Sequence, residues 1–391
     1  KTLKRTWADI SLDNLEYNYR SIRAHLPQGT KFLGVMKADA YGHGAVPVSR
    51  ALADLGAEYL AVSNLEEAVQ IRRGEVRLPI LILGYTPAEY AANMIFLDIT
   101  QEVHSLEYAR ELNEALAGTN YILNVHLKLD TGMTRIGFFA YDNERTLDEL
   151  RQVAQLPHLH IEGVFMHFCV ADSRAEEDVS FTKLQYKRFM DMLSAMEGAG
   201  IRPEIRHCCN SGATILYPEF ALDMVRPGII TYGNAPSDEL EGALSLRPMM
   251  SLHSMIAQVR TVPAGTDISY GRLYRTKEET RVAVLPIGYA DGLSRLLTGK
   301  ASFYLQGHQV PVIARICMDM CMIDVSGVPE AKPGDVVTIF GYDDDGTLLP
   351  CERLARAQGT INYELLCQIS KRIPRICHRG AETSQILQYI V

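Results

Sequence analysis

The stretch YLAVSNLEEAVQIRRGEVRLPILIL, residues 59–83, decides the fold class. It begins with the short apolar run 59–62, continues with an amphipathic segment rich in Glu, Ala and Arg, and closes with the apolar run 78–83. Short apolar runs favour buried strands, and an amphipathic segment of this length favours a helix. The stretch therefore predicts two parallel strands joined by a right-handed helical connection.

The same alternation extends from about residue 30 to residue 235. The apolar runs lie at 32–36, 59–62, 78–83, 94–99, 122–129, 161–168, 205–209 and 224–233. Amphipathic segments separate most of them, such as 181–200, which ends in glycine as helices often do. Eight such units predict a (β/α)₈ barrel, and an open doubly wound sheet is the alternative that the pattern alone leaves open.

After residue 245 the helical pattern nearly disappears. Apolar runs punctuated by Gly, Pro and Asp lie at 251–262, 280–290, 301–313, 321–328 and 334–341, and one late helix is expected near 351–359. Such runs are typical of antiparallel strands joined by turns. We therefore expect a barrel over residues 10–245, and a mainly antiparallel β-domain formed by residues 246–391 with an initial strand in residues 1–9.

Composition restricts the class of protein and its partners. The 391 residues hold 39 basic and 47 acidic side chains, and a net charge of −8 argues against nucleic acid or an anionic membrane as a partner. No window reaches the ~18 apolar residues of a membrane span, and no signal peptide is visible. The eight cysteines form no CxxC pair, so we expect reduced thiols in a cytoplasmic protein and neither a zinc site nor a disulfide framework. Because the chain begins with Lys1, an upstream segment stays open.

Polar residues follow five of the predicted barrel strands. In such barrels the functional groups gather at the carboxyl ends of the strands. The residues at these ends are Lys37, Asp39 and Tyr41 after the first strand, Lys128, Asp130 and Arg135 after the fifth, His167 after the sixth, Asn210 and Ser211 after the seventh, and Arg226 and Gly228 after the eighth. The sequence therefore predicts one site at this end of the barrel.

Lys37 is the residue that most clearly indicates a chemistry. It follows an apolar strand, so we expect its amine to be partly desolvated, which makes an amine more nucleophilic and suits it to a Schiff base. Ser211, Tyr41 and the backbone at Gly228–Ile229 could supply donors to a phosphate, which barrels often bind after strands seven and eight. A lysine beside a phosphate site suggests pyridoxal 5′-phosphate as the cofactor.

The whole chain resembles the pyridoxal-phosphate-dependent alanine racemases. The segments that carry the resemblance, in the family's order, are VMKADAYGHG (35–44), KLDTGMTRIG (128–137), MHF (166–168), NSGAT (210–214), VRPGI (225–229), ISYG (268–271), LPIGYADG (285–292), RICMD (315–319) and TINYE (360–364). The first of these segments and RICMD are individually specific. The resemblance implies a homodimer that interconverts L- and D-alanine by a two-base mechanism and supplies D-alanine for peptidoglycan.

The resemblance also assigns roles to residues. Lys37 would form the aldimine with the cofactor, and Tyr270 of the second subunit would be the opposing base, linked through His167 to Arg226, which would face the pyridine nitrogen. The residues assigned to the cofactor, most of them to its phosphate, are Tyr41, Asn210, Ser211, Gly228, Ile229 and Tyr363. An arginine there leaves the nitrogen unprotonated, because it can only donate.

Further residues would contact the substrate. Arg135 and the backbone of Met318 would bind its carboxylate, and Lys128 matches a lysine that is carbamylated in many family members. Cys317, Asp319 and Tyr289 would line the wall and narrow the entrance. The sequence departs from the family at Thr134, where glycine is common, and at 212–214, which replaces an Ala-rich stretch.

Three alternatives remain open at this point. A serine or dual serine/alanine racemase, sometimes the cytoplasmic part of a longer membrane protein, shares the chemistry, although Tyr363 favours alanine. Decarboxylases of basic amino acids share the architecture but lack the ISYG and RICMD combination. A cofactor-carrier protein of the same barrel would lack the second domain.

Overall fold

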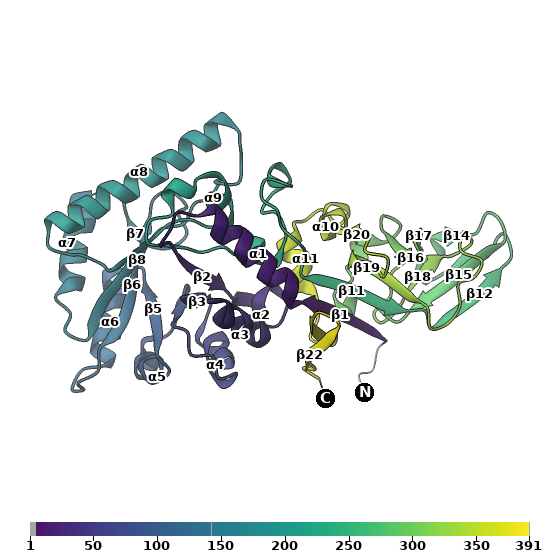
Figure 1. Cartoon of the computed structure of the whole chain (residues 1–391), viewed down its shortest axis with the longest axis horizontal. Helices are drawn as coiled ribbons and strands as arrows, with labels where there is room; N and C mark the ends of the chain where they lie inside the picture. The colour runs from purple at the N-terminus through teal and green to yellow at the C-terminus, as the bar shows by residue number, and fades with distance from the viewer. Residues whose placement is uncertain (1–4, 142, 391) are drawn as a thin grey trace. The chain divides into compact units, whose positions relative to one another are not determined.

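The computed structural model describes residues 5–141 and 143–390 in two units (Figure 1). The barrel unit holds Leu15–Ala40 and Ala45–Arg247. The β unit holds the described residues up to Asn14, the short segment Tyr41–Gly44 and the chain from Pro248 onward. Residues 1–4, which belong to the expected initial strand segment, lie outside the described residues, as does residue 391. Within the described ranges, no helix has both the length and the apolar character needed to cross a membrane.

The barrel unit is a closed sheet of eight parallel strands. Its strands, in chain order, are β2 (Lys31–Val35), β3 (Tyr59–Val62), β4 (Ile80–Ile82), β5 (Ile99–Val103), β6 (Leu123–Asp130), β8 (Leu159–Phe165), β9 (Ile205–His207) and β10 (Met224–Val225). Each strand pairs with the next, and β10 returns to β2, so the sheet has no open edge. The short strand β7 (Phe138–Phe139) pairs with β6. The predicted barrel is confirmed, and the open doubly wound sheet is excluded.

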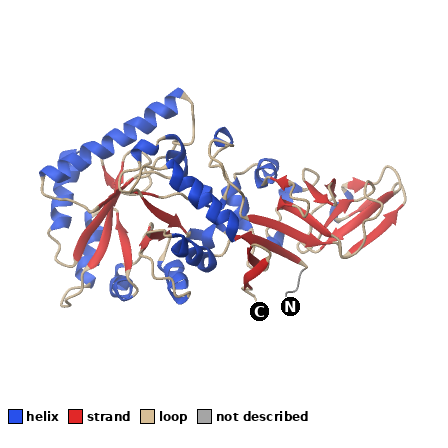
Figure 2. Cartoon of the chain, viewed as in Figure 1, coloured by secondary structure: helices blue, strands red, loops and turns tan. Residues whose placement is uncertain are grey.

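Helices connect the barrel strands and lie outside them (Figure 2). The helices up to Arg247, with α1 beginning three residues before the barrel unit, are α1 (Leu12–His25), α2 (Lys37–Tyr41), α3 (Ala45–Leu55), α4 (Leu65–Arg73), α5 (Ala91–Phe96), α6 (Leu106–Ala115), α7 (Asn143–Ala154), α8 (Glu176–Gly198) and α9 (Ser211–Leu216), with 3₁₀ turns η1 (Ala88–Tyr90), η2 (Pro218–Phe220), η3 (Ile229–Tyr232) and η4 (Asp238–Leu240). The expected glycine stop of α8 is present. Gly200 has φ +80° and donates to Glu197, while Ile201 donates to Met196, which is the Schellman pattern.

The fourth strand lies later in the chain than we expected. The apolar run 94–99 forms the end of helix α5 and a turn, and the strand β5 begins at Ile99 with the sequence ITQEV. Its polar residues Thr100, Gln101 and Glu102 are all buried. Periodicity missed the strand because polar side chains occupy positions where apolar ones are usual.

The barrel strands bury apolar side chains and a layer of polar ones. Leu60, Leu81 and Val125 are fully buried apolar residues of β3, β4 and β6. The histidines His126 and His207 are equally buried, at 0% exposure. Buried polar groups are costly unless they are hydrogen-bonded, so this layer has to be satisfied internally.

The β unit is built on one large, mainly antiparallel sheet, as expected. Its strands are β1 (Thr6–Ser11), β11 (Met250–Met255), β12 (Gln258–Val262), β15 (Thr280–Leu285), β16 (Ser302–Leu305), β17 (His308–Ile313), β18 (Cys321–Asp324), β19 (Val336–Tyr342), β20 (Leu348–Leu349), β21 (Arg375–Arg379) and β22 (Glu382–Leu387). Strand β1 pairs with β11 in the antiparallel sense and with β21 in the parallel sense. The segment Thr6–Ser11 is therefore part of this sheet.

The β unit also contains two helices and a separate small hairpin. Helix α10 (Cys351–Gln358) is the expected late helix, and Gly359 ends it with φ +81°. A second helix, α11 (Asn362–Gln368), was not expected. The hairpin pairs β13 (Asp267–Ile268) with β14 (Tyr274–Arg275), and the 3₁₀ turns are η5 (Tyr270–Arg272), η6 (Tyr289–Asp291) and η7 (Arg295–Leu297).

Candidate active site

An uncommon backbone turn follows Lys37 at the end of strand β2. Four consecutive residues other than glycine have φ between 52° and 55°, namely Ala38, Asp39, Ala40 and Tyr41. A left-handed conformation costs an L-residue roughly 1–2 kcal/mol, so a run of four needs strong local support.

Side chains from helix α4 and from the turn itself supply that support. Glu67 Oε1 accepts the backbone hydrogen of Ala38 at 2.7 Å. Asp39 Oδ1 accepts the backbone hydrogen of Ala45 at 2.8 Å and a side-chain hydrogen of Gln70 at 3.3 Å. These bonds fix the direction in which the chain leaves Lys37. Sequence reasoning did not identify Glu67, because a glutamate in the first turn of a helix is common.

The side chain of Lys37 is exposed. The expectation that its apolar strand would desolvate the amine is therefore wrong for the chain as described. The neighbours in sequence, Val35 and Met36, are buried, and burial ends at the lysine itself.

Arg226 lies directly after strand β10 and is only 3% exposed. Its guanidinium donates to the carbonyl oxygens of Met166 at 2.7 Å and Cys208 at 3.1 Å, and to Nδ1 of His207 at 2.9 Å. Burial lowers the pKa of Arg226 to about 10, so the group is a cation at neutral pH. Among the described residues, no carboxylate forms an ion pair with it. Its remaining capacity can only donate hydrogen bonds.

His167 also contacts the guanidinium of Arg226. The distance from Nη2 to Nδ1 is 3.3 Å, and the histidine nitrogen must accept because arginine cannot. Burial, followed by nearby positive charge, holds the pKa of His167 well below its usual value; the cations are Arg226, Lys128, Arg135 and Lys37. Predicted cations from three strand ends, those of the first, fifth and eighth strands, therefore act electrostatically on one imidazole, which stays neutral.

Lys128 is the most deeply buried amine at this end of the barrel, at 5% exposure. Its Nζ donates to the carbonyl oxygen of Leu129 at 3.2 Å and lies 5.1 Å from the ring centre of Phe165. Burial and the charge of Arg226 lower the pKa of Lys128 to about 7. A large share of this amine is therefore neutral near pH 7, which is the form that reacts with carbon dioxide.

The loop after strand β6 presents Arg135 at the surface of the barrel unit. Asp130 Oδ1 accepts the backbone hydrogens of Gly132 and Thr134, both at 3.0 Å. Thr134, where the family commonly has glycine, has φ +56°. The departure from the family pattern therefore lies at a position where the backbone itself favours glycine.

The candidate phosphate site of the barrel unit lies between α9 and η3. Ser211 Oγ accepts the backbone hydrogen of Gly228 at 2.9 Å, so the hydroxyl hydrogen of Ser211 remains to be donated. Ile229 is fully buried. Asn210 caps α9 through Ala213 at 3.0 Å and donates to Phe168 at 3.1 Å. Its amide orders the loop, whereas the hydroxyl of Ser211 is the donor placed for an anion; the backbone hydrogen of Gly228 is already donated to Ser211, and the assignment of Gly228 to the phosphate stays a prediction.

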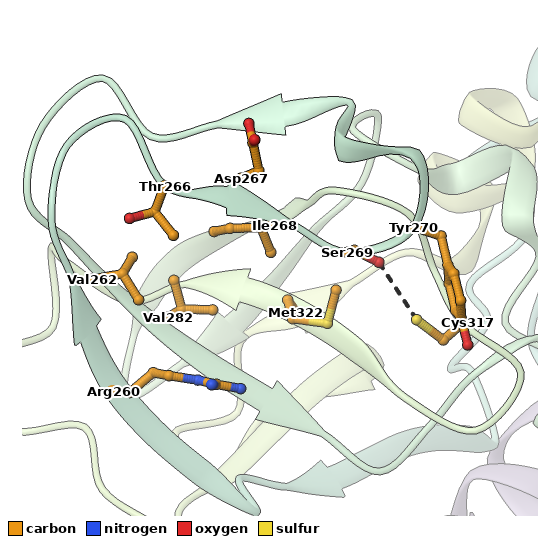
Figure 3. Close-up of a pocket in the computed structure, with 10 residues that line it drawn as sticks. All are labelled: Arg260, Val262, Thr266, Asp267, Ile268, Ser269, Tyr270, Val282, Cys317 and Met322. Carbon is orange, nitrogen blue, oxygen red and sulfur yellow. Dashed lines mark hydrogen bonds between the residues drawn. The ribbon is translucent and has the colours of Figure 1, made fainter.

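Tyr270, the predicted opposing base, lies at the tip of the β13–β14 hairpin and is 68% exposed. Ser269, which precedes it with φ +62°, donates from Oγ to the carbonyl of Arg315 at 2.9 Å, and the same oxygen lies 3.5 Å from Sγ of Cys317. Figure 3 shows this contact beside the ring of Tyr270, at the rim of a 430 Å³ cavity in the β unit. The ISYG motif therefore contacts the RICMD motif through Ser269.

The GYADG motif packs against the same RICMD backbone. The backbone hydrogens of Tyr289 and Ala290 are donated to the carbonyls of Cys317 and Met318, each at 3.0 Å. A side chain at Gly288 would have its Cβ 2.3 Å from the Cys317 oxygen, so only glycine allows this approach. The side chains of Tyr289 and Met318 are exposed. The β unit thus gathers three of the family's motifs at one place.

Asp319 takes part in an ion-pair group of its own chain. Arg372 Nη2 lies 2.8 Å from its Oδ1, and Arg372 Nε lies 3.5 Å from the fully buried Asp291. Arg5 also pairs with Asp291 at 2.8 Å. The role of Asp319 as a wall residue stays a prediction.

The two tyrosines assigned to the phosphate lie together within the β unit. The ring centres of Tyr41 and Tyr363 are 5.9 Å apart, and burial raises the pKa of Tyr41, so its hydroxyl keeps its hydrogen. The adjacent carbonyl of Gly42 accepts from Nε of the buried Arg375 at 2.9 Å. Arg375 was not predicted, since it is one of three arginines in the segment 371–379 and the sequence gives no signal of its partners.

Comparison with known proteins identifies relatives over the whole chain. Residues 10–236 match the family model described as alanine racemase, N-terminal domain, and residues 249–377 match alanine racemase, C-terminal domain. The chain is 46% identical over 370 residues to an alanine racemase of Desulfovibrio desulfuricans, covering 95% of this chain and 97% of that one.

Solved structures give the same result. An alanine racemase of Clostridium difficile 630 has a TM-score of 0.93 at 40% identity, covering 100% of both chains. The crystal structure of an alanine racemase from Bacillus anthracis with bound L-Ala-P has a TM-score of 0.93 at 34% identity, covering 100% of this chain and 99% of that one. These matches confirm the resemblance and set aside the decarboxylase and carrier alternatives. This chain belongs to the alanine racemase family.

Proposed function

We propose that this protein interconverts L- and D-alanine with pyridoxal 5′-phosphate as cofactor. The observation that carries the proposal is the combination of Lys37 and Arg226 after two paired strands, β2 and β10. Lys37 supplies a primary amine for a Schiff base, and Arg226 supplies a buried cation without an acidic partner in the described part of the chain.

The donor groups of the chain suit this cofactor. Arg226 can donate to a pyridine nitrogen but cannot accept from one, so that nitrogen would stay unprotonated. We assign the phosphate to the hydroxyl of Ser211, the backbone at Gly228–Ile229 and the phenols of Tyr41 and Tyr363, with Gly228 donating to the phosphate in place of Ser211. When bound, the cofactor supplies an electron sink that acidifies the α-hydrogen of the amino acid attached to it. An unprotonated nitrogen weakens that sink, which favours prompt return of a proton to carbon over side reactions.

Racemisation needs a proton acceptor on one face of the α-carbon and a proton donor on the other. We assign these roles to the amine of Lys37 and the phenol of Tyr270 from a second copy of the chain. Tyr270 is 68% exposed in its own chain, which suits a residue that acts in a homodimer. His167, held neutral beside Arg226, would then form a hydrogen bond to the oxygen of that phenol through its Nε2.

The substrate carboxylate needs cationic or N–H partners. We assign it to Arg135 and to the backbone of Met318, with Cys317, Asp319 and Tyr289 along the wall. Lys128 is a candidate for carbamylation, because its lowered pKa leaves neutral amine and a carbamate would give Arg135 an anionic partner.

Alanine is a better-supported substrate than serine. The relatives and the solved structures reported above are named alanine racemases, and Tyr363 occupies a position that would restrict a larger polar side chain. We also propose a cytoplasmic location, in keeping with eight cysteines that are all free thiols. D-Alanine made there would serve peptidoglycan synthesis.

The test combines a spectrum with circular dichroism. We expect the purified chain to show the visible absorption of a pyridoxal Schiff base, and L-alanine to lose its optical activity much faster than L-serine at equal enzyme concentration. Lys37→Ala should abolish the absorption band and lower racemisation by at least about a hundredfold. Lys31→Ala, at the opposite end of the same strand, is the matched control and should retain both. Full racemisation by the Lys37 variant would disprove the proposal.

A further inference from the structure

A hydrogen-bonded chain of side chains crosses the interior of the barrel from Arg226. Arg226 Nη1 lies 2.9 Å from Nδ1 of His207, and Nε2 of His207 lies 2.8 Å from Nδ1 of His126. Nε2 of His126 lies 3.1 Å from Oε2 of Glu162. Both histidines are fully buried, and Glu162 is the first acidic group along this chain.

Arginine determines where every hydrogen in the chain lies. Because a guanidinium has no acceptor, Nδ1 of His207 must accept, so the ring hydrogen of neutral His207 is on Nε2. That hydrogen is donated to Nδ1 of His126, whose own hydrogen is then on Nε2 and points to Glu162. Protonating either ring twice would place two donors against each other. Burial accordingly lowers the pKa of both histidines.

The far end of the chain is built to accept a hydrogen. Tyr59 donates to Glu162 Oε2 at 2.8 Å, and Thr100 does so at 3.2 Å. Although burial alone would raise the pKa of Glu162, the hydrogen bonds from His126 and Tyr59 lower it. An ionised carboxylate can only accept hydrogen bonds. Glu162 therefore requires the hydrogen of His126 to be on Nε2, which is the same tautomer that Arg226 requires from the other end of the hydrogen-bonded series.

Packing fixes both rings in place. A Cβ at Gly163 would lie 2.5 Å from Cε1 of His126, so only glycine leaves room for this imidazole. The ring of Phe165 stacks on His207 with centres 4.9 Å apart and planes at 10°. Neither histidine can turn to exchange its ring nitrogens without displacing these neighbours.

We propose that Glu162 is a positioning residue for Arg226 and acts through the two histidines between them. It accepts the hydrogen on Nε2 of His126, stabilises the tautomers that Arg226 requires in both rings, and thereby holds the guanidinium in a single orientation. It also supplies the acidic group that Arg226 lacks nearby, while leaving the side of the guanidinium that faces the cofactor without an acid. The expected effect of Glu162 on catalysis rests on the proposed function, whereas the tautomers assigned to His126 and His207 do not.

Neutron diffraction of the deuterated full-length enzyme with its cofactor tests the tautomers without any variant. We expect a deuteron on Nε2 and none on Nδ1 in both His126 and His207. A deuteron on Nδ1 of either ring would overturn the proposal, whatever reaction the protein catalyses. If the wild-type protein with its cofactor shows no racemase activity, that result counts against the proposed function alone.

Variants of Glu162 test the consequence for Arg226. Glu162→Leu removes the acceptor and should lower kcat for racemisation by about tenfold while KM for alanine changes little. Losing a hydrogen-bond partner that orients a functional group typically costs about tenfold or more in activity. Glu162→Gln retains an acceptor oxygen and should recover most of kcat. Tyr59→Phe removes one hydrogen bond to the same carboxylate but leaves the bond from Nε2 of His126 in place, so as the matched comparison it should lower kcat much less than Glu162→Leu does.

A second variant separates the relay from the carboxylate itself. Gly163→Ala leaves Glu162 in place but displaces the ring of His126, so it should lower kcat as Glu162→Leu does. If Glu162→Leu and Gly163→Ala both fold and both keep the wild-type kcat, Arg226 needs no support from the hydrogen-bonded histidines and Glu162, and the proposal is wrong.

Discussion

At the scale of single residues, Thr134 is a strained position that a substitution can relieve. A β-branched residue at φ +56° is a backbone outlier, and the cost is roughly 1–2 kcal/mol. Thr134→Gly removes this strain but adds freedom to the unfolded chain, which costs roughly 0.5–1 kcal/mol. We therefore expect the free energy of unfolding to rise by up to about 1 kcal/mol, measured by urea unfolding. Thr134→Ala, which keeps a Cβ at the same φ, is the control and should gain less; a glycine variant less stable than the wild type would contradict this account.

Lys128 gives the protein a pH-dependent stability. Its pKa is about 7 in the folded chain and about 10.4 when unfolded, so the unfolded chain binds more protons between these values. Stability should therefore rise with pH from about 7 to about 10, by at most about 4 kcal/mol. Lys128→Met should flatten this part of the curve in chemical denaturation across pH. The same slope in the variant would assign it to other groups. A mass increase at Lys128 in the native protein would identify the carbamate, which removes the amine from this titration.

At the scale of elements, the sequence predicts the helices and strands whose apolar residues recur with a regular spacing. The apolar runs at β2 and β3 are strands as expected, because their buried positions are apolar throughout. Strand β6 was also predicted, because its apolar residues alternate along the strand, although His126 and Lys128 between them are buried as well. The strand β5 was misplaced because its buried side chains are polar, and helix α11 was missed because it is only seven residues long. The left-handed turn after Lys37 could not be predicted, since it contains no glycine and depends on Glu67 and Gln70 from another helix.

The candidate site shows the same division. The rule that functional groups follow barrel strands brings Lys128, His167 and Arg226 to one end of the barrel, because it depends only on strand order, and their roles stay predictions. The chain from His207 to Glu162 is invisible in the sequence, since its members lie on different strands at positions that usually carry core side chains. Partners of buried polar residues follow from the register of the closed sheet, which no local pattern specifies.

At the scale of the whole molecule, the proposed mechanism requires two chains. If each site combines Lys37 of one chain with Tyr270 of the other, neither Lys37→Ala nor Tyr270→Phe is active alone. A mixed dimer contains one site with both residues intact and one with neither. When differently tagged variants are unfolded together and reassembled at equal amounts, half of the dimers are mixed and each has one intact site, so activity should recover to about a quarter of the wild-type value.

The mixed dimer also distinguishes the alternatives. Sites contained within one chain would leave every chain in the mixture defective, and no activity would return. Reassembled wild-type enzyme measures the yield of the procedure, and mixing Lys37→Ala with itself measures the background. Isolating the doubly tagged species should give about half of the wild-type activity per dimer, because one of its two sites is complete. Recovery of activity would also account for the exposure of Tyr270 on its hairpin. A phenol that is exposed in its own chain is available to the active site of a second chain.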